Sequence, residues 1–177
     1  MPMKNALLKT DKKASFKTWW FKTFMNLYPM FFGTGGKVLF IADDWQEVHI
    51  RLRLNWWTRN YVGTIFGGSM FSASDPFYML MLLHNLGKQY VVWDKSASIR
   101  FRRPAKKRIY AKYLIDESLL ATIREEIQQA GETTRVLSIA WVDPQGTVYA
   151  QVERTVYMAD KAFYKQKRAK KLSSMEK

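Results

Sequence analysis

An apolar segment of helical length, residues 69–86, stands between segments that are typical of β-strands. It ends before Gly87, a residue type that suits a helix C-terminus. Upstream, residues 47–54 alternate apolar and polar side chains, which predicts a strand with one buried and one solvated face. Strands and helices do not alternate along the chain, which argues against a doubly wound parallel sheet. The order favours an α+β protein in which an antiparallel sheet wraps around one long central helix.

Shorter segments complete this arrangement. Apolar residues spaced by three and four from Phe16 predict a helix to about Leu27, with a turn at Pro29. Residues 117–130, closed by Gly131, predict another helix. Further strands are expected over 38–42, 90–93, 96–101, 108–115, 134–142 and 147–158, with a hairpin turn at 143–146.

Positive charge is concentrated at the two ends of this 177-residue chain, whose net charge is +14. Residues 1–22 hold six lysines and one aspartate, and residues 159–177 hold seven basic and two acidic residues. We therefore divide the chain into a basic N-terminal segment with an aromatic helix (1–30), one domain (31–158) and a basic C-terminal tail (159–177). Solvated, solubilising ends are the simplest interpretation, and an anionic membrane surface, nucleic acid or an anionic carrier protein are the alternatives.

Several classes of function lack the residues that they need. Without cysteine, the chain has no disulfide and no thiolate site, and its two separated histidines, His49 and His84, form no recognisable zinc site. It has no Walker loop and no dinucleotide fingerprint, so we expect no cofactor. No apolar run reaches the roughly 20 residues of a spanning helix, and no secretory signal is recognisable, which predicts a cytoplasmic protein.

The stretch from Asn60 to Asp75 carries the residues best suited to chemistry. Gly67 and Gly68 stand at the start of the apolar helix, where backbone N–H groups are unpaired and no Cβ blocks a substrate carbonyl. This arrangement is typical of an oxyanion hole. Asp75 is a carboxylate among Met, Phe, Leu and Ala. A carboxylate in such surroundings destabilises the fold unless it is solvated, is hydrogen-bonded or has a role in binding or catalysis. The alternative interpretation is structural: Asp75 caps a helix that begins at Pro76, and the glycines form a turn.

The same stretch resembles the hotdog-fold acyl-CoA thioesterases. Those proteins often show Asn, then Gly-Thr-x-x-Gly-Gly, then an acid on the central helix, and the matching residues here are Asn60, Gly63, Thr64, Gly67, Gly68 and Asp75. The segment 94–105 is similar to the strand and Arg-Pro turn that follow the hotdog helix. Over residues 30–158 the chain is most similar to uncharacterised bacterial proteins of the DUF4442 and phenylacetate-thioesterase-like group. Phe66 stands where the family usually has histidine.

The resemblance implies a fold, a reaction and a role for each matching residue. The N–H of Gly67 would bind the thioester carbonyl, Asn60 would orient that carbonyl or the attacking water, and Asp75 would act as base or nucleophile. Gly68 and Thr64 would contact the substrate. The acid and the glycine loop usually come from opposite subunits of this family, so a homodimer or homotetramer is implied.

Basic and apolar side chains suggest where the two parts of an acyl thioester bind. Arg100, Arg102 and Arg103 are either a solvated sheet end or a contact for coenzyme A phosphates or an acidic acyl carrier protein. An acyl tunnel would be lined by Phe71, Phe77, Met79 and Met81, each of which is otherwise core.

Two other functions remain open besides hydrolysis of a fatty or aryl acyl thioester. One is a non-catalytic acyl-CoA or lipid-binding hotdog protein, and the other is a membrane-surface adaptor that uses the basic ends. No specific nucleic acid is expected as a partner. A hotdog dehydratase would need a histidine near its acid, whereas His84 lies nine residues after Asp75.

Overall fold

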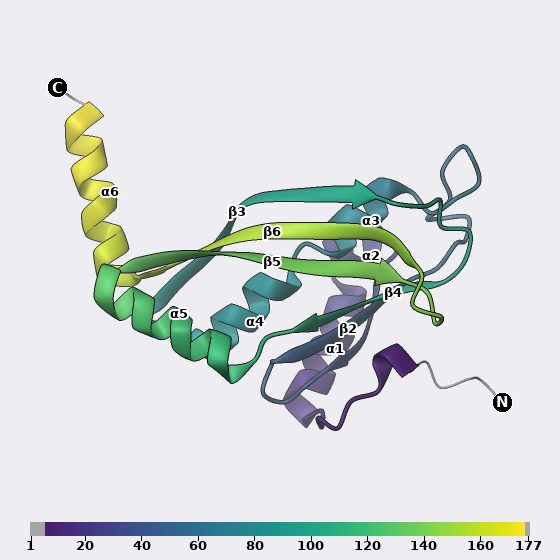
Figure 1. Ribbon diagram of the computed structural model, residues 1–177, viewed down its shortest axis with the longest axis horizontal. Coiled ribbons are helices and arrows are strands. Elements are labelled where there is room, and N and C mark those ends of the chain that lie inside the picture. Colours follow the sequence, from purple (N-terminus) through teal and green to yellow (C-terminus); the bar gives the residue numbers. More distant parts are fainter. Residues whose placement is uncertain (1–5, 176–177) are drawn as a thin grey trace.

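A single antiparallel sheet forms the body of the molecule (Figure 1). The computed structural model describes residues 6–175, and in it the six strands follow the order β1-β2-β4-β5-β6-β3. The strands are β1 (Lys37–Ile41), β2 (Glu47–Leu52), β3 (Tyr90–Phe101), β4 (Ile109–Leu114), β5 (Glu132–Val142) and β6 (Val148–Asp160). The strands expected over 90–93 and 96–101 are one strand, β3, whose pairing with β6 shifts between Asp94 and Ser96. Strands β1 and β3 are the two edges.

Two helices stand where one long central helix was expected. They are α3 (Gly67–Ala73) and α4 (Phe77–Leu86), and the chain breaks between them at residues 74–76. Pro76 explains the break, because proline has no N–H to donate and its ring clashes with the preceding turn. The carbonyl of Ser74 that the break frees accepts a hydrogen bond from the hydroxyl of Tyr113 on β4, at 3.2 Å.

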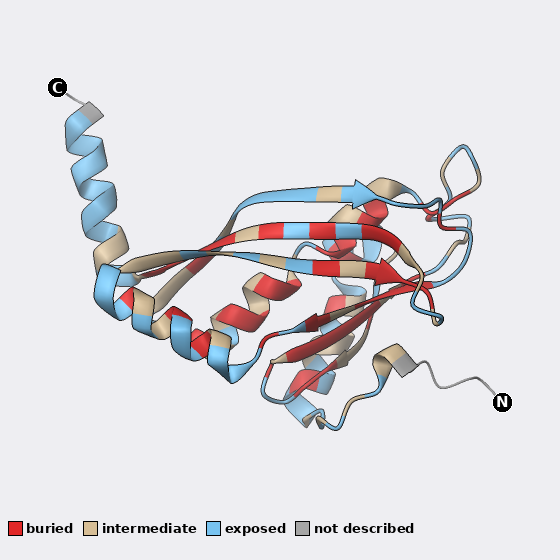
Figure 2. Ribbon diagram, viewed as in Figure 1, coloured by how far each residue is buried: buried red, intermediate tan, exposed pale blue. Residues whose placement is uncertain are grey.

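The hydrophobic core lies between this helical layer and the concave face of the sheet. Buried positions run along the inner faces of β4, β5 and β6 and along the facing sides of α3 and α4 (Figure 2). The indole Nε1 of Trp141, on β5, donates to the carbonyl of Met70 at 3.0 Å. This bond fixes the height of α3 above the sheet, and α3 carries the glycines of the candidate site.

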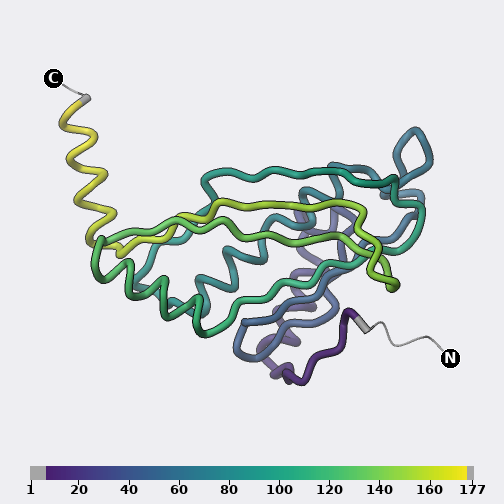
Figure 3. Tube along the Cα trace, viewed as in Figure 1, coloured from purple at the N-terminus to yellow at the C-terminus, as the bar shows by residue number. Residues whose placement is uncertain are grey.

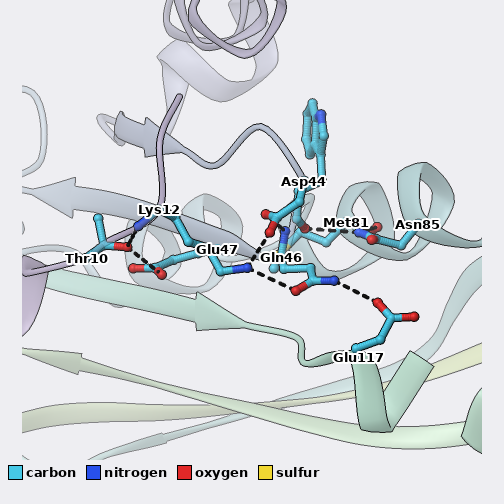
Figure 4. Close-up of polar contacts among 9 residues, drawn as sticks. Thr10, Lys12, Asp44, Gln46, Glu47, Met81, Asn85 and Glu117 are labelled. Atoms are coloured by element: carbon cyan, nitrogen blue, oxygen red, sulfur yellow. Dashed lines mark hydrogen bonds and ion pairs between the residues drawn. The ribbon is translucent and has the colours of Figure 1, made fainter. Parts of the chain in front are cut away.

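Strand β2 is buried on both faces, which corrects the expectation of one solvated face. The extended N-terminal segment lies over the outer face: Thr10 donates to the carboxylate of Glu47 at 2.8 Å, and Lys12 contacts Asp44 and Gln46 (Figure 4). Glu47 also pairs with Lys112 at 2.9 Å and with His49 at 2.6 Å. The alternating pattern is present, but its polar residues are covered because they bond to one another and to the N-terminal segment.

The aromatic N-terminal helix packs beside edge strand β1. Helix α1 (Phe16–Leu27) begins at a capping box between Ser15 and Thr18, and Pro29 starts a short helix, α2 (Pro29–Gly33), where a turn was expected. Phe21 packs on Trp45, whose ring stacks on His84 of α4 at 3.8 Å between centroids. These contacts join α1 to the end of the central helical layer.

The C-terminal residues form a helix that projects from the body (Figure 3). Helix α5 (Glu117–Ala130) has the expected bounds and packs against β5 and β6. After β6 the chain continues as α6 (Lys161–Met175), in a region expected to be a solvated tail. Lys167 pairs with Glu132 at 2.5 Å, which ties the first half of α6 to the sheet. The short helix η1 (Ala6–Leu8) precedes α1. Over residues 6–175, no helix is both long and apolar enough to cross a membrane.

Candidate functional site

A closed loop leads into α3 and carries the first two candidate residues. The side-chain oxygen of Asn60 accepts from the N–H of Thr64 at 2.9 Å, and its Nδ2 donates to the hydroxyl of Thr64 at the same distance. Gly63, at φ +78°, adopts the left-handed conformation that this tight loop requires. Both side-chain groups of Asn60 are therefore used to close the loop, and Asn60 positions the loop in this structure.

Helix α3 begins at Gly67, as the sequence suggested, and its first turn is covered by two aromatic rings. A Cβ on Gly67 would come within 2.7 Å of the Phe101 ring, and one on Gly68 within 2.3 Å of the Phe66 ring. Glycine is therefore needed at both positions for packing. Within residues 6–175 the N–H groups of Gly67 and Gly68 have no hydrogen-bond partner, so both remain available as donors.

A cavity of about 450 Å³ opens beside Gly67. Five of the candidate residues line it together: Asn60, Thr64, Gly67, Arg102 and Arg103. Phe101 and Pro104 contribute an apolar wall. The structure therefore brings the glycine loop and the Arg-Pro turn together, although some 40 residues separate them along the chain.

The two arginines of this cavity are held by β6. Arg102 donates from Nε and Nη2 to the side-chain oxygen of Gln151 at 3.1 and 2.7 Å, and Arg103 donates to the carbonyl of Val148 at 3.3 Å. Neither forms an ion pair within the described residues, so their charges are available to an anion. Arg100 is exposed on β3 and does not line the cavity.

Asp75 lies in a different place. It follows the end of α3, eight residues after Gly67, which corresponds to about 12 Å along a helix axis. It lines a second cavity, of about 320 Å³, together with Tyr28, Phe71 and Pro76. One chain therefore does not bring Asp75 and the Gly67 cavity together. Within residues 6–175 the Asp75 carboxylate makes no capping bond to α4 and instead accepts from Nη1 of Arg154.

Arg154 is a functional candidate that the sequence analysis did not identify. It lies on β6 with its side chain 3% exposed, and a single nitrogen, Nη1, donates to Asp75 at 2.8 Å and to Asp94 at 2.5 Å. Its guanidinium lies over the Phe71 ring, 5.5 Å from the centroid. Asp75 itself is exposed, so the cluster runs from the protein interior to the surface of the second cavity.

Several polar atoms in the inner part of this cluster make no hydrogen bond within the described residues. Over residues 6–175, Oδ1 of Asp94 and both Nε and Nη2 of Arg154 have no partner. Burial raises the pKa of Asp94, although the hydrogen bond from Arg154 opposes that shift. A buried cation and a half-buried acid with unused hydrogen-bonding groups lower the stability of the folded state, and such groups are often found where a ligand or solvent binds.

The only sequence signal for Arg154 was an arginine in an otherwise alternating strand. Its neighbours Val152 and Val156, two positions away on either side, are buried on the same face. A charged residue on the inner face of a strand requires a partner. Its identification needed the strand register, which sets Arg154 opposite Ala97 of β3, three residues from Asp94.

Two further expectations concern the acyl tunnel and metals. Phe77 and Met81 are fully buried in the core and so cannot line an open tunnel in this structure, whereas Phe71 does line the Asp75 cavity. Met79 packs against the core. In the part of the chain that the structure describes, no group of His, Asp and Glu side chains could hold a metal ion.

Comparison with known protein families matches most of the sequence to one of them. A family model described as a domain of unknown function, DUF4442, matches residues 17–158. No curated protein matches the sequence.

Solved structures of bacterial proteins share the fold. A Pseudomonas aeruginosa protein of unknown function, described as a probable thioesterase, superposes with a TM-score of 0.70 at 18% identity, over 85% of this chain and 99% of that chain. A thioesterase from Haemophilus influenzae gives 0.61 at 12% identity, over 84% and 94%. A Chlorobaculum tepidum protein of unknown function gives 0.64 at 15%, over 81% and 94%. The expected hotdog fold is confirmed by these likenesses.

Proposed function

The chain belongs to the DUF4442 family, and from this premise we propose that it hydrolyses an acyl thioester. The observation that carries the proposal is the Asp75 carboxylate, which is held by buried Arg154 at the edge of an apolar cavity. Structural likeness to thioesterases supports the same reaction class. The substrate is a fatty or aryl acyl group joined to coenzyme A or to an acyl carrier protein.

The reaction needs a base, an oxyanion donor and a leaving thiol. Asp75 takes a proton from a water molecule, the water oxygen attacks the thioester carbonyl, and the N–H of Gly67 donates to the oxygen that becomes negative. The tetrahedral intermediate then collapses, the C–S bond breaks and the thiolate takes the proton back. Arg154 holds the Asp75 carboxylate in place through one of its oxygens, which leaves the other free for the water.

Asp75 has a second possible role as the nucleophile. In that route its carboxylate attacks the thioester to form an anhydride and expel the thiolate, and water then hydrolyses the anhydride. Unlabelled free acid from a single turnover in ¹⁸O-labelled water identifies the anhydride route with water attack on the enzyme carboxyl, because the acid then leaves with an oxygen of Asp75 and the label enters Asp75. In the base mechanism the oxygen of the attacking water enters the free acid in the first turnover.

The two halves of the site come together only between subunits in this proposal. Gly67 and Asp75 line separate cavities of one chain, and β3 is an unpaired sheet edge of twelve residues. Unpaired edges are templates for another strand. Antiparallel pairing of β3 with its copy places the glycine loop of one subunit near the acid of the other, which matches the arrangement implied by the family resemblance.

The arginine turn supplies the site for the thiol carrier. Arg102 and Arg103 line the Gly67 cavity and have no acidic partner among the described residues, and guanidinium groups suit phosphate oxygens. Coenzyme A phosphates and the phosphopantetheine of a carrier protein offer the same chemistry. The apolar lining of the Asp75 cavity suits the acyl group.

Thiol release from short, medium, long and aryl acyl-CoAs tests this function. The unmodified protein should turn over at least one member, and Asp75→Asn should lose about a thousandfold in kcat with little change in Tm, because asparagine keeps an oxygen for Arg154. A matched control is Asp160→Asn, which removes the same charge at the end of β6 and should leave turnover unchanged. Acyl-CoA binding without turnover on any substrate would instead support a non-catalytic binding protein.

A further inference from the structure

A surface groove of about 470 Å³ lies beside edge strand β1, between the α1–α2 region and residues 53–57. Three of its lining residues are cationic: Lys37 on β1, Arg51 on β2 and Arg53 just beyond β2. Apolar side chains surround them, namely Leu27, Phe32, Trp56 and Trp57. Among residues 6–175, no acidic side chain lines the groove. A ligand that fills this groove would therefore need both a negative charge for the cations and an apolar part for the rim.

The groove cations repel one another and have no counter-ion in the part of the chain that the structure describes. Lys37 and Arg51 are direct cross-strand partners in the β1–β2 ladder, an arrangement in which like charges destabilise a sheet. Within residues 6–175 the side chains of Lys37, Arg51 and Arg53 have no hydrogen bond or ion pair. Burial lowers the pKa of Arg51, and the charges of Arg108 and Arg53 lower it further, opposed by Tyr110. An anion bound between these groups would relieve the repulsion.

The apolar rim continues along α1 as an exposed aromatic face. Five side chains lie at helical spacing on the outside of this helix: Phe16, Trp19, Trp20, Phe24 and Leu27. Leu27 belongs to both the face and the groove. The helix contains no acidic residue, and Lys17 and Lys22 carry its charge. Aromatic side chains beside lysines are typical of helices that lie in a membrane interface.

We propose that this groove and the α1 face together bind the surface of an anionic lipid bilayer. The phosphate of a lipid headgroup enters the groove between Lys37, Arg51 and Arg53, while the aromatic side chains of α1 lie among the headgroups and upper acyl chains. The proposal goes beyond thioester hydrolysis and does not depend on it. It also assigns membrane contact to one folded surface.

The positive charge of the groove favours an anionic bilayer over a second copy of the chain as the binding partner. A two-fold dimer brings the same patch of each subunit together, so this surface would place the groove cations of one copy against those of the other. The strand order adds to this argument, because β1 and β3 are opposite edges of the sheet. Pairing through β3, as proposed for the thioesterase, leaves the groove open to a membrane.

Binding to vesicles tests the proposal directly. The full chain should sediment with vesicles that contain equal parts of phosphatidylglycerol and phosphatidylcholine, and far less with vesicles of phosphatidylcholine alone. The triple variant Lys37→Gln/Arg51→Gln/Arg53→Gln should bind the anionic vesicles about tenfold more weakly or worse. Trp19→Ser/Trp20→Ser should weaken binding to a similar extent, because it removes apolar contact with no change in charge.

A matched triple variant separates the groove from net charge. Lys165→Gln/Arg168→Gln/Lys170→Gln removes the same charge from α6 and should weaken binding less than about threefold. Equal losses in both triple variants would show that net charge alone attracts the protein, and would overturn the proposal. A change of oligomeric state in Trp19→Ser/Trp20→Ser, measured by sedimentation velocity, would overturn it too, because the α1 face would then join copies of the chain.

Thermal unfolding provides the folding control and distinguishes the source of the phosphate. In sodium chloride the groove variant should have a Tm equal to or above that of the unmodified protein, because the removed cations repel one another. Inorganic phosphate at equal ionic strength should raise the Tm of the unmodified protein and not that of the groove variant. A phosphate effect without vesicle binding would overturn the bilayer as the partner.

Discussion

Nη1 of Arg154 lies 2.8 Å from Oδ1 of Asp75 and 2.5 Å from Oδ2 of Asp94, so one buried nitrogen joins an exposed acid to a half-buried acid. The break between α3 and α4 makes this contact possible. A continuous helix would carry residue 75 on in the helical path, whereas Pro76 interrupts that path beside β6. The proposed base is therefore oriented by a strand more than 70 residues later in the chain.

Removal of Arg154 should destabilise the fold because Asp94 then loses its ion-pair partner. Arg154→Met should lower the free energy of unfolding by about 3 kcal/mol, since half-buried Asp94 loses the one ion pair that it forms within residues 6–175. The double variant Arg154→Met/Asp94→Leu should recover most of that loss, because it also removes the carboxylate that Arg154→Met leaves without a partner. Urea denaturation of the two variants measures the difference. An equal loss of stability in both would mean that Asp94 does not depend on Arg154.

The packing of Gly67 against Phe101 gives a test at the other cavity. In Gly67→Ala the new methyl group meets the Phe101 ring, which lines the cavity and must shift to make room. We expect kcat/KM to fall about tenfold while stability falls by less than about 1 kcal/mol, because the ring is half exposed and can swing away. Gly33→Ala is the control, since nothing lies within 4 Å of its added Cβ. Unchanged kinetics in Gly67→Ala would separate this cavity from the reaction.

The buried Glu47–His49 pair should make stability depend on pH. Burial lowers the pKa of His49 below its usual 6.5, although Glu47 opposes the shift, so the folded state favours neutral His49 and loses stability as the pH falls through about 6.5. For Glu47, burial would raise the pKa, but Lys112, Thr10 and His49 outweigh it and lower it below 4.5. Its contribution is present above about pH 4.5 and is lost as the pH falls further.

Thermal unfolding across this pH range assigns the two steps. His49→Gln should flatten the curve of Tm against pH near pH 6 and leave the more acidic step in place. Glu47→Gln should flatten the more acidic step, and it should lower Tm at neutral pH because Lys112 then loses its partner. Curves parallel to that of the unmodified protein in both variants would contradict the assignment.

The exposed edge of β3 predicts how the subunits assemble. Successive N–H groups of a strand point to opposite sides, so of the neighbours Ala97 and Ser98 one N–H faces β6 and the other faces outward. A proline at the outward position should give a folded monomer without thioesterase activity, and one at the other position should disrupt the fold. Sedimentation velocity and circular dichroism distinguish these results. An oligomer that survives both substitutions would show that β3 is not the interface.

Local patterns in the sequence were sufficient for most elements of the fold. Helix α5 runs from Glu117 to Ala130 as its apolar spacing and Gly131 predicted, and Asp143–Gly146 forms the expected hairpin turn, where Gly146 has φ +85°. These features depend on neighbours within a few residues, so the sequence records them directly. The residues from Asn60 to Asp75 resemble the motif of the hotdog-fold thioesterases, and that resemblance implied the hotdog fold that the structural comparisons confirm.

Tertiary structure decided which of these residues meet. The register between β3 and β6 sets Arg154 near Asp94, and the break between α3 and α4 sets Asp75 beside the same guanidinium; no periodicity in the sequence specifies either contact. The N-terminal segment covers the polar face of β2, so residues 47 and 49 are buried against the expectation of their alternating pattern. By itself the sequence determined the elements and the candidate chemistry, because local geometry is short-range. Which charges are buried, paired or left open is decided only when distant segments come into contact.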